Sequence, residues 1–166
     1  MSTDAIVVLK GDHQKVRKLF RDFQGTGENA IATKGKIAKR LSAELTIHPY
    51  LENTVRYPQV RARTHEVEDD VLEFYEEHHV VDVLCMELSA MAPDAERFDA
   101  KMSVLIENVT HHMKEEEEDW FPKVRKGLRR TTLQELGARM VKLRSTAPRS
   151  PAQPSALKKV VDAVIA

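Results

Sequence analysis

Apolar residues recur at steps of three and four along most of this chain, which is the spacing that places them on one face of an α-helix. The first such stretch runs from about Asp4 to Gln24, and we expect Gly25 and Gly27 to end it. A second stretch runs from about Glu28 to Arg56. Tyr57-Pro58 is expected to end that helix, because the residue before a proline disfavours helical backbone angles.

Two further stretches repeat this arrangement in the second half of the chain. One runs from about Arg61 to Met91, and Ala92-Pro93-Asp94 is the expected break and helix cap. The next runs from about Ala95 to Trp120 and is expected to stop at Phe121-Pro122. Four long helices with short links predict an all-α fold, an up-down-up-down four-helix bundle.

Residues 131–166 are predicted to form a C-terminal helical extension to a bundle made of residues 1–130. Thr132 and Glu135 match a capping box, which would open a fifth helix ending near Leu143. Residues 147–154 contain three prolines and are expected to form an extended linker. A small amphipathic helix is expected over residues 155–166.

The chain contains an internal repeat. Residues 48–58 and residues 112–122 share the pattern His, three residues, Glu, four residues, aromatic residue, Pro. Upstream, Asp12-His13 and Glu77-His78 share the pattern acid-His-x-x-Val. His13 precedes His48 by 35 residues, and His78 precedes His112 by 34. The sequence therefore predicts two similar helical hairpins, which pack into a bundle with approximate two-fold symmetry.

The repeat places polar side chains on the apolar faces of the helices. Residues at i and i+4 lie on one helical face, so His48 with Glu52, and His112 with Glu116, each present an imidazole and a carboxylate in one direction. Each such group left unpaired in a core would cost about 1–3 kcal/mol, and a charged one more. A bound metal ion would compensate these groups directly.

The number and type of these groups indicate which metal. The six candidate ligands are His13, His48, Glu52, His78, His112 and Glu116. Six ligands are too many for one tetrahedral zinc ion but suit two metal ions. Imidazole and carboxylate without thiolate favour iron or manganese. If both carboxylates bridge the ions, each ion keeps an open position for a small molecule.

This motif, with the trailing Tyr57-Pro58 and Phe121-Pro122, resembles the hemerythrin-like, or HHE cation-binding, family of non-haem di-iron proteins over about residues 5–125. The resemblance implies a four-helix bundle that holds two non-haem iron ions with a bridging oxo or hydroxo group. It also implies that the four histidines are terminal ligands and that the two glutamates are bridging carboxylates. The implied partner is a small ligand: O2, H2O2 or NO.

One departure from the family pattern bears on function. Respiratory hemerythrins have a further histidine four residues away in the third helix, whereas the positions four either side of His78 are Phe74 and Asp82. This departure argues against simple reversible oxygen carriage. The alternatives are a peroxide-decomposing, catalase-like enzyme and a metal-dependent oxygen or iron sensor without turnover.

Several neighbouring residues compete for places at the site. His79 is adjacent to His78 but has a mixed set of residues on its face, and His111 has Glu115 at i+4. The aromatic-proline register favours His112 over His111. Asp82, His79, His111 or a tyrosine remain open as an additional ligand. Tyr50 and Tyr75 are candidate donors beside the site, with core packing as the favoured role.

Composition excludes other classes of function. The 26 basic and 26 acidic residues cancel, which disfavours a nucleic-acid partner. No apolar stretch approaches the ~20 residues of a membrane span, so no membrane partner is expected. The single Cys85 rules out an intrachain disulfide and suits a reducing cytoplasm. The oligomeric state is left open.

Two further classes compete with the di-iron hypothesis. A ferritin-like oxidase needs Glu-x-x-His on two helices, and only Glu76 and His79 supply that spacing. A metal-free helical interaction module would predict that replacing His48 or Glu116 by alanine leaves stability unchanged.

Overall fold

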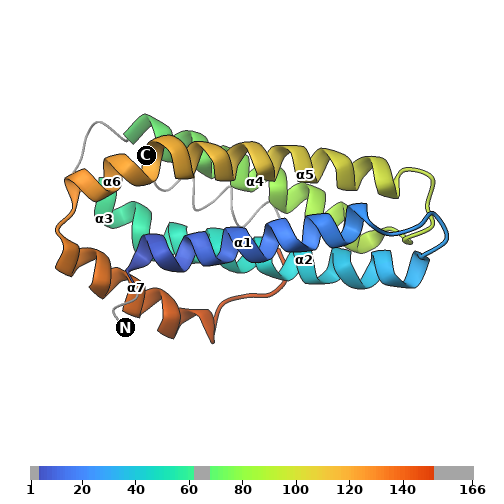
Figure 1. Ribbon diagram of the computed structural model, residues 1–166, viewed down its shortest axis with the longest axis horizontal. Helices are drawn as coiled ribbons and strands as arrows, with labels where there is room; N and C mark the ends of the chain where they lie inside the picture. The colour runs from blue at the N-terminus through green and yellow to red at the C-terminus, as the bar shows by residue number, and fades with distance from the viewer. Residues whose placement is uncertain (1–3, 62–67, 152–166) are drawn as a thin grey trace.

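A computed structural model describes residues 4–61 and 68–151 of the chain, and every regular element in these two ranges is helical. Four long helices form the bundle: α1 (Ala5–Gln24), α2 (Ile31–Leu51), α4 (Glu68–Ala90) and α5 (Phe98–Glu115). They pack in a ring in which α1 contacts α2 and α5, and α4 contacts the same two helices (Figure 1). The predicted all-α four-helix bundle is confirmed. None of the helices in the described ranges is both long and apolar enough to cross a membrane.

The first helix forms as its sequence pattern predicts. Asp4 is its N-cap, and the Asp4 carboxylate accepts a hydrogen bond of 3.0 Å from the backbone N–H of Val7. The helix ends at Gly25. Its buried face carries the apolar residues in the expected register and, among them, Asp12 and His13.

The second and fourth helices do not end where their prolines predicted. α2 continues through a π-helical turn, η1 (Glu52–Arg56), into α3 (Tyr57–Arg61). α5 continues in the same way through η3 (Glu116–Trp120) into α6 (Phe121–Gly127). The expected stops at Tyr57-Pro58 and Phe121-Pro122 are therefore wrong. The internal repeat is also present in the backbone: each half has one π turn, and it begins at Glu52 in the first half and at Glu116 in the second.

The π turn explains how a proline fits there. Tyr57 and Phe121 have helical backbone angles, φ −58° and ψ −44° for the first and φ −60° and ψ −40° for the second. The N–H of each bonds to the carbonyl five residues back, that of Glu52 or Glu116. A proline in a regular α-helix clashes with the carbonyl four residues before it. The wider turn increases that separation, so the helix continues past the proline.

Two predicted caps are also wrong. α7 (Arg130–Arg144) begins before Thr132, and its N-cap, Arg129, makes no side-chain capping bond. α5 begins at Phe98 with Arg97 as N-cap, so Asp94 does not cap it. Residues 62–67, the end of the proposed linker and the predicted helix at 155–166 lie outside the described residues.

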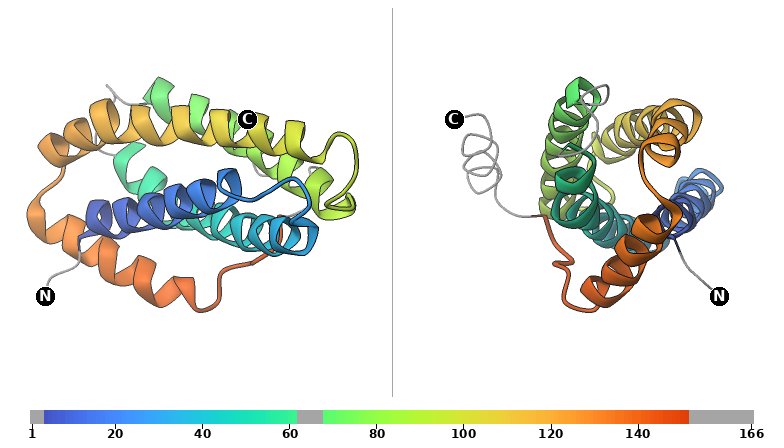
Figure 2. Two further views of the ribbon diagram at one scale, coloured as in Figure 1. Left: turned by 45° about the vertical axis from the view of Figure 1, so that its right-hand side comes forward. Right: turned by 90° about the vertical axis from the view of Figure 1, so that its left-hand side faces the viewer.

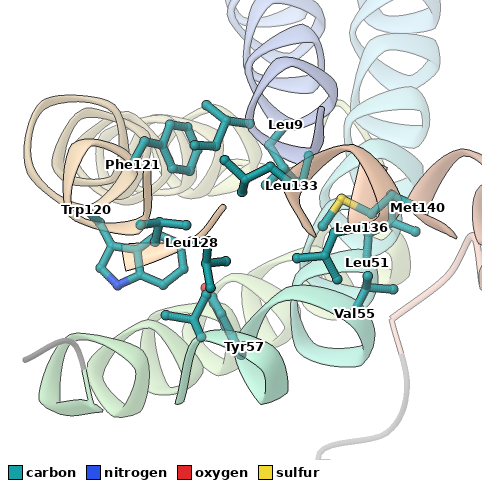
Figure 3. Packing of buried hydrophobic residues seen from close by; sticks show 14 of the residues in the cluster. Leu9, Leu51, Val55, Tyr57, Trp120, Phe121, Leu128, Leu133, Leu136 and Met140 are labelled. Atoms are coloured by element: carbon teal, nitrogen blue, oxygen red, sulfur yellow. The ribbon is translucent and has the colours of Figure 1, made fainter. Parts of the chain in front are cut away.

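α7 packs against α1 and α2 along the side of the bundle (Figure 2). Leu133, Leu136 and Met140 of α7 are buried and point toward Leu9 and Leu51 of the bundle (Figure 3). This apolar cluster, cluster 1, also contains Trp120 from the end of η3 and Phe121 from the start of α6. The division of the chain at residue 130 stays a prediction, but α7 and the bundle share one cluster.

A second apolar cluster, cluster 2, fills the other half of the bundle. It includes Val16, Phe20, Leu41, Leu105 and Met113. Along α1, cluster 1 ends at Leu9 and cluster 2 begins at Val16. The buried polar residues Asp12 and His13 lie between them. The bundle core is therefore two apolar halves separated by one polar layer.

Replacing Leu136 with alanine tests whether α7 is part of the folded core. Leu136 is 3% exposed, so we expect the free energy of unfolding to fall by about 2–5 kcal/mol. Val141 lies on the same helix and is 54% exposed, so Val141→Ala should cost less than about 0.5 kcal/mol. Urea unfolding followed by circular dichroism measures both. If Leu136→Ala lowers the free energy of unfolding no more than Val141→Ala does, α7 adds no packing energy to the core.

Candidate metal centre

The polar layer brings together all six residues predicted as metal ligands. They come from α1, α2, η1, α4, α5 and η3, one from each element: His13, His48, Glu52, His78, His112 and Glu116. Each of them is buried, with at most 6% of its surface exposed. Side chains that are far apart in the sequence therefore meet in one enclosed site, as the repeat predicted.

The four imidazoles form two pairs, one from each hairpin. His13 Nε2 lies 3.3 Å from His48 Nε2, and His78 Nε2 lies 3.1 Å from His112 Nε2. All four rings thus present the same nitrogen to the centre of the layer. We call these two groups the first pair (His13, His48) and the second pair (His78, His112).

Each glutamate reaches across both pairs. Glu52 Oε2 lies 3.3 Å from the Nε2 atoms of both His48 and His78. Glu116 Oε2 lies 3.2 Å from His13 Nε2 and 3.6 Å from His112 Nε2. A carboxylate that bridges two metal ions must face the ligands of both, and both glutamates meet this requirement.

The donor set fits a cation on its own chemistry. Ligand atoms of His48, Glu52, His112 and Glu116 all lie within 4.8 Å of one another, and all four residues are buried. Two neutral imidazoles in contact through Nε2 share at most one proton, and carboxylates add only lone pairs. The layer therefore holds more acceptors than donors, which a buried site tolerates when a cation binds to it.

Carboxylates other than those of Glu52 and Glu116 face the other ring nitrogen of three histidines. His13 Nδ1 lies 2.6 Å from Glu117 Oε1, which also accepts a 2.9 Å bond from Arg17. His112 Nδ1 lies 2.5 Å from Glu77 Oε2. Such a carboxylate keeps the proton on Nδ1 and leaves the Nε2 lone pair for a metal ion.

The third of these carboxylates belongs to a longer chain of contacts. Asp12 Oδ2 lies 3.6 Å from His48 Nδ1 and accepts a hydrogen bond from Arg144 of α7. Burial opposes ionisation of Asp12, but His48 and Arg144 outweigh it and hold its pKa at about 2. Asp12 is therefore a carboxylate at every pH at which the protein would be handled.

The surroundings in this layer raise the pKa of two histidines and lower the pKa of a third. Burial disfavours the charged form of His48 and His112, but nearby carboxylates, first Glu52 and Glu116 respectively, raise the pKa of both rings above the usual value. Burial dominates at His78 and lowers its pKa, although Glu52 opposes it. His78 is thus the ring whose neutral form is most favoured.

The aromatic residues of the repeat cover the outer faces of two histidines. Tyr57 stacks on His78 with ring centroids 6.0 Å apart and planes 11° apart. Phe121 stacks on His13 at 5.7 Å and 14°. Each aromatic residue comes from one hairpin and covers the first-helix histidine of the other. Tyr57 also donates a 3.3 Å hydrogen bond to Glu52 Oε2.

A small cavity adjoins the imidazoles on the side of cluster 2. Its volume is about 20 Å³, and besides the four histidines it is lined by apolar side chains: Val16, Leu45, Pro49, Val81, Val109 and Met113. The smallest cavity that holds one water molecule has a volume of about 10–15 Å³. The site therefore has room for one very small ligand.

The competing residues lie elsewhere. The side chain of His111 is 66% exposed and pairs with Glu115, and His79 is only half-buried. Tyr50 and Tyr75 pack against cluster 1, the role favoured for them. Asp82 is buried, but within the described ranges no hydrogen bond or ion pair joins it to the six. Burial raises the pKa of Asp82 to about 6.

Four residues in contact with the six had no assigned role at the site from the sequence: Asp12, Glu77, Glu117 and Tyr57. Asp12 and Glu77 were part of the repeat without an assigned role, although their position directly before His13 and His78 was the available signal. Glu117 lies within five consecutive acids, residues 115–119, and such a run is typical of a solvated helix face. Tyr57 was noted only with its proline, while Tyr50 and Tyr75 were the candidate tyrosines. Cys85 is a buried core residue, and burial raises the pKa of its thiol to about 12.

Comparison with known proteins supports this site. A family model described as the hemerythrin HHE cation binding domain matches residues 4–124. The chain belongs to the hemerythrin HHE family. Members of this family bind metal cations, and the buried His/Glu layer is where this chain has the donors to do so.

Two individual proteins are similar to this HHE chain. A DNA nickase from Nostoc sp. (strain PCC 7120) is 31% identical over 123 residues, which cover 73% of this chain and 33% of the nickase. The chain thus matches about a third of that relative's length. The crystal structure of a hemerythrin HHE cation binding domain-containing protein from Mycobacterium kansasii superposes with a TM-score of 0.72. That match covers 86% of both chains at 23% identity, and it shows a shared fold.

Asp82→Asn tests whether Asp82 is a buried carboxyl outside the donor set. Its pKa is raised from 3.8 to about 6, so the folded state binds a proton that the unfolded state releases. Wild-type stability should therefore fall relative to the variant as the pH rises from 4 to 7. At pH 8 the variant should be more stable by about 1–3 kcal/mol, measured by urea unfolding. Loss of bound metal in this variant would instead make Asp82 a ligand.

Proposed function

We propose that this HHE chain is a non-haem di-iron protein that binds or reacts with a small oxygen species, O2, H2O2 or NO. The observation that supports this most directly is the apolar cavity of about 20 Å³ against the four imidazoles. It suits a diatomic molecule or peroxide. An ordinary metabolite needs a pocket of about 300 Å³ or more.

The six buried residues are proposed as the ligands. His13 and His48 would hold one ion, His78 and His112 the other, and Glu52 and Glu116 would lie between them. The choice of iron rests on a nitrogen and oxygen donor set, because Cys85, the one thiol, is in cluster 2. When bound, the iron pair supplies an oxo or hydroxo bridge, redox chemistry and an open coordination position.

The chain's own residues prepare the site for such a ligand. Glu117 and Glu77 hold the Nδ1 protons of His13 and His112, which keeps both Nε2 lone pairs toward the centre. Tyr57 donates to Glu52 and so orients that carboxylate. The apolar wall of the cavity excludes bulk water from the side on which a ligand would bind.

A small molecule is a better partner for this site than a nucleic acid. The relative named as a DNA nickase is about three times as long as the part this chain matches, so its activity can depend on regions outside the matched part. A phosphodiester could not reach a metal held by residues that are at most 6% exposed without opening the bundle. The buried thiol of Cys85 suits a reducing cytoplasm, where we expect the protein to act.

Two versions of the function differ in turnover. A peroxide-decomposing enzyme is the first, and a sensor of oxygen species or iron is the second. The positions four residues either side of His78 are compatible with both versions, because neither adds a ligand. Phe74 packs edge-on against His112 at 5.0 Å, and in the described residues Asp82 makes no hydrogen bond or ion pair with the six. With no fifth histidine there, we propose that both ions keep an open position.

Adjacent histidines provide a matched test of the ligand set. Protein purified from iron-supplemented cells should contain about two iron ions per chain and absorb in the near ultraviolet through oxo-to-iron charge transfer. His112→Ala should lose that band and at least one ion. His111→Ala should keep both, because the His111 side chain is 66% exposed on the same helix. Wild-type protein with fewer than about 1.5 ions and no band would contradict the di-iron proposal.

Filling the cavity tests where the small ligand reacts. Val109 lines the cavity and is 4% exposed, so Val109→Ile should narrow it without removing a ligand. We expect unchanged iron content but at least about tenfold slower reaction with peroxide, followed by loss of the near-ultraviolet band or by oxygen release. Val104→Ile, at a position 46% exposed on the same helix, is the control.

The same assay distinguishes the two versions of the function. Oxygen release that continues for many equivalents of peroxide per chain supports the enzyme, and a single reaction per chain supports the sensor. If Val109→Ile and Val104→Ile react at the wild-type rate, the ligand does not enter through this cavity.

A further inference from the structure

The internal repeat also relates the residues that follow the two glutamates. Glu117 comes directly after Glu116, and Asn53 comes directly after Glu52. Glu117 accepts from Nδ1 of His13, the first-helix histidine of the other hairpin. By the same symmetry, Asn53 is the residue in the place that would serve His78. The first half of the repeat thus has a neutral amide, Asn53, at the position where the second half has a carboxylate, Glu117.

The structure shows the consequence at His78. Its Nδ1 atom is buried and has no hydrogen-bond partner among residues 4–61 and 68–151, and the same holds for Oδ1 of Asn53. Glu117 and Glu77 lie within hydrogen-bonding distance of Nδ1 of His13 (2.6 Å) and His112 (2.5 Å). Nδ1 of His48 likewise has no hydrogen-bond partner in these ranges, but the ionised carboxylate of Asp12 lies 3.6 Å from it. Two of these three carboxylates serve the first pair and one serves the second.

This difference has a known effect on metal affinity. A carboxylate on the far nitrogen of a ligating histidine fixes the tautomer and raises the basicity of the ligating nitrogen. For Nε2 of His78 to bind an ion, Nδ1 must keep a proton, and a buried N–H without an acceptor is unfavourable. Loss of such an outer partner typically weakens metal binding by about 10–100-fold.

We propose that the two metal positions are unequal and that Asn53 sets the difference. The ion at the first pair, His13 and His48, is bound first and tightly. The ion at the second pair, His78 and His112, is bound second and about 10–100-fold more weakly, so it is the one that exchanges. This inference rests on the proposed function in one respect, namely that the chain binds two ions.

A metal titration of the full chain tests this directly. The chain is dialysed against buffers of graded free Co²⁺, and bound cobalt is measured by elemental analysis and by its visible absorption. Wild type should load in two steps separated by about 10–100-fold in free Co²⁺. In Asn53→Asp the second step should move toward the first, while the first stays in place.

The symmetric position supplies a second variant that does not depend on the first. Glu117→Gln gives the first pair the same kind of neutral neighbour, so the first step should weaken and the separation should shrink. Glu118→Gln changes the next residue, whose side chain is 68% exposed, and should leave both steps unchanged. Circular dichroism confirms that each variant folds, and Glu117→Gln decides the question if Asn53→Asp does not fold.

The possible failures are distinct. Two ions that load in a single step in wild type would overturn the unequal positions and leave the di-metal proposal standing. Two steps that neither Asn53→Asp nor Glu117→Gln shifts would remove Asn53 as the cause. A wild-type chain that binds fewer than two cobalt ions would contradict both this inference and the proposed function.

Discussion

The burial of four imidazoles and two carboxylates in one layer is the constraint on which the rest of this structure depends. These groups have lone pairs directed at one another, and a core tolerates them only if protons or a cation are shared among them. The apolar clusters on both sides of the layer exclude the water that would otherwise solvate them. Packing and metal binding are therefore coupled, because the layer divides the core through all four helices.

The two π turns are how the chain places its glutamates in that layer. Each turn begins at the glutamate and shifts the register of the helix, so that the aromatic residue five positions on faces a histidine of the other hairpin. π turns are frequent at functional sites because they redirect side chains without ending the helix. The same local device thus orients a carboxylate and covers a ring in both halves.

That these six residues meet in one layer could be predicted from the sequence, because it depends on helical spacing and on the repeat, including the aromatic-proline register that favours His112 over His111. An i, i+4 pair on an apolar helical face, repeated once with its upstream histidine, leaves little freedom for where those side chains point. The π turns could not be predicted, because the rule that a proline ends a helix assumes α-helical geometry. Glu117 was hidden for another reason: its counterpart in the repeat is Asn53, so no pattern marked it, and it lies within five consecutive acids.

The contact between α7 and the polar layer could not be predicted from any pattern in the sequence. Arg144 and Asp12 are 132 residues apart, and Arg144 lies beyond residues 4–124, the part that matches the HHE family. Arg144 donates to Asp12, which stays ionised at a pKa of about 2 and faces Nδ1 of His48. A guanidinium on that carboxylate withdraws part of its charge from His48, so α7 acts on the basicity of a proposed ligand through one intermediate. The helix that completes the apolar core therefore also adjusts the first pair of the metal layer.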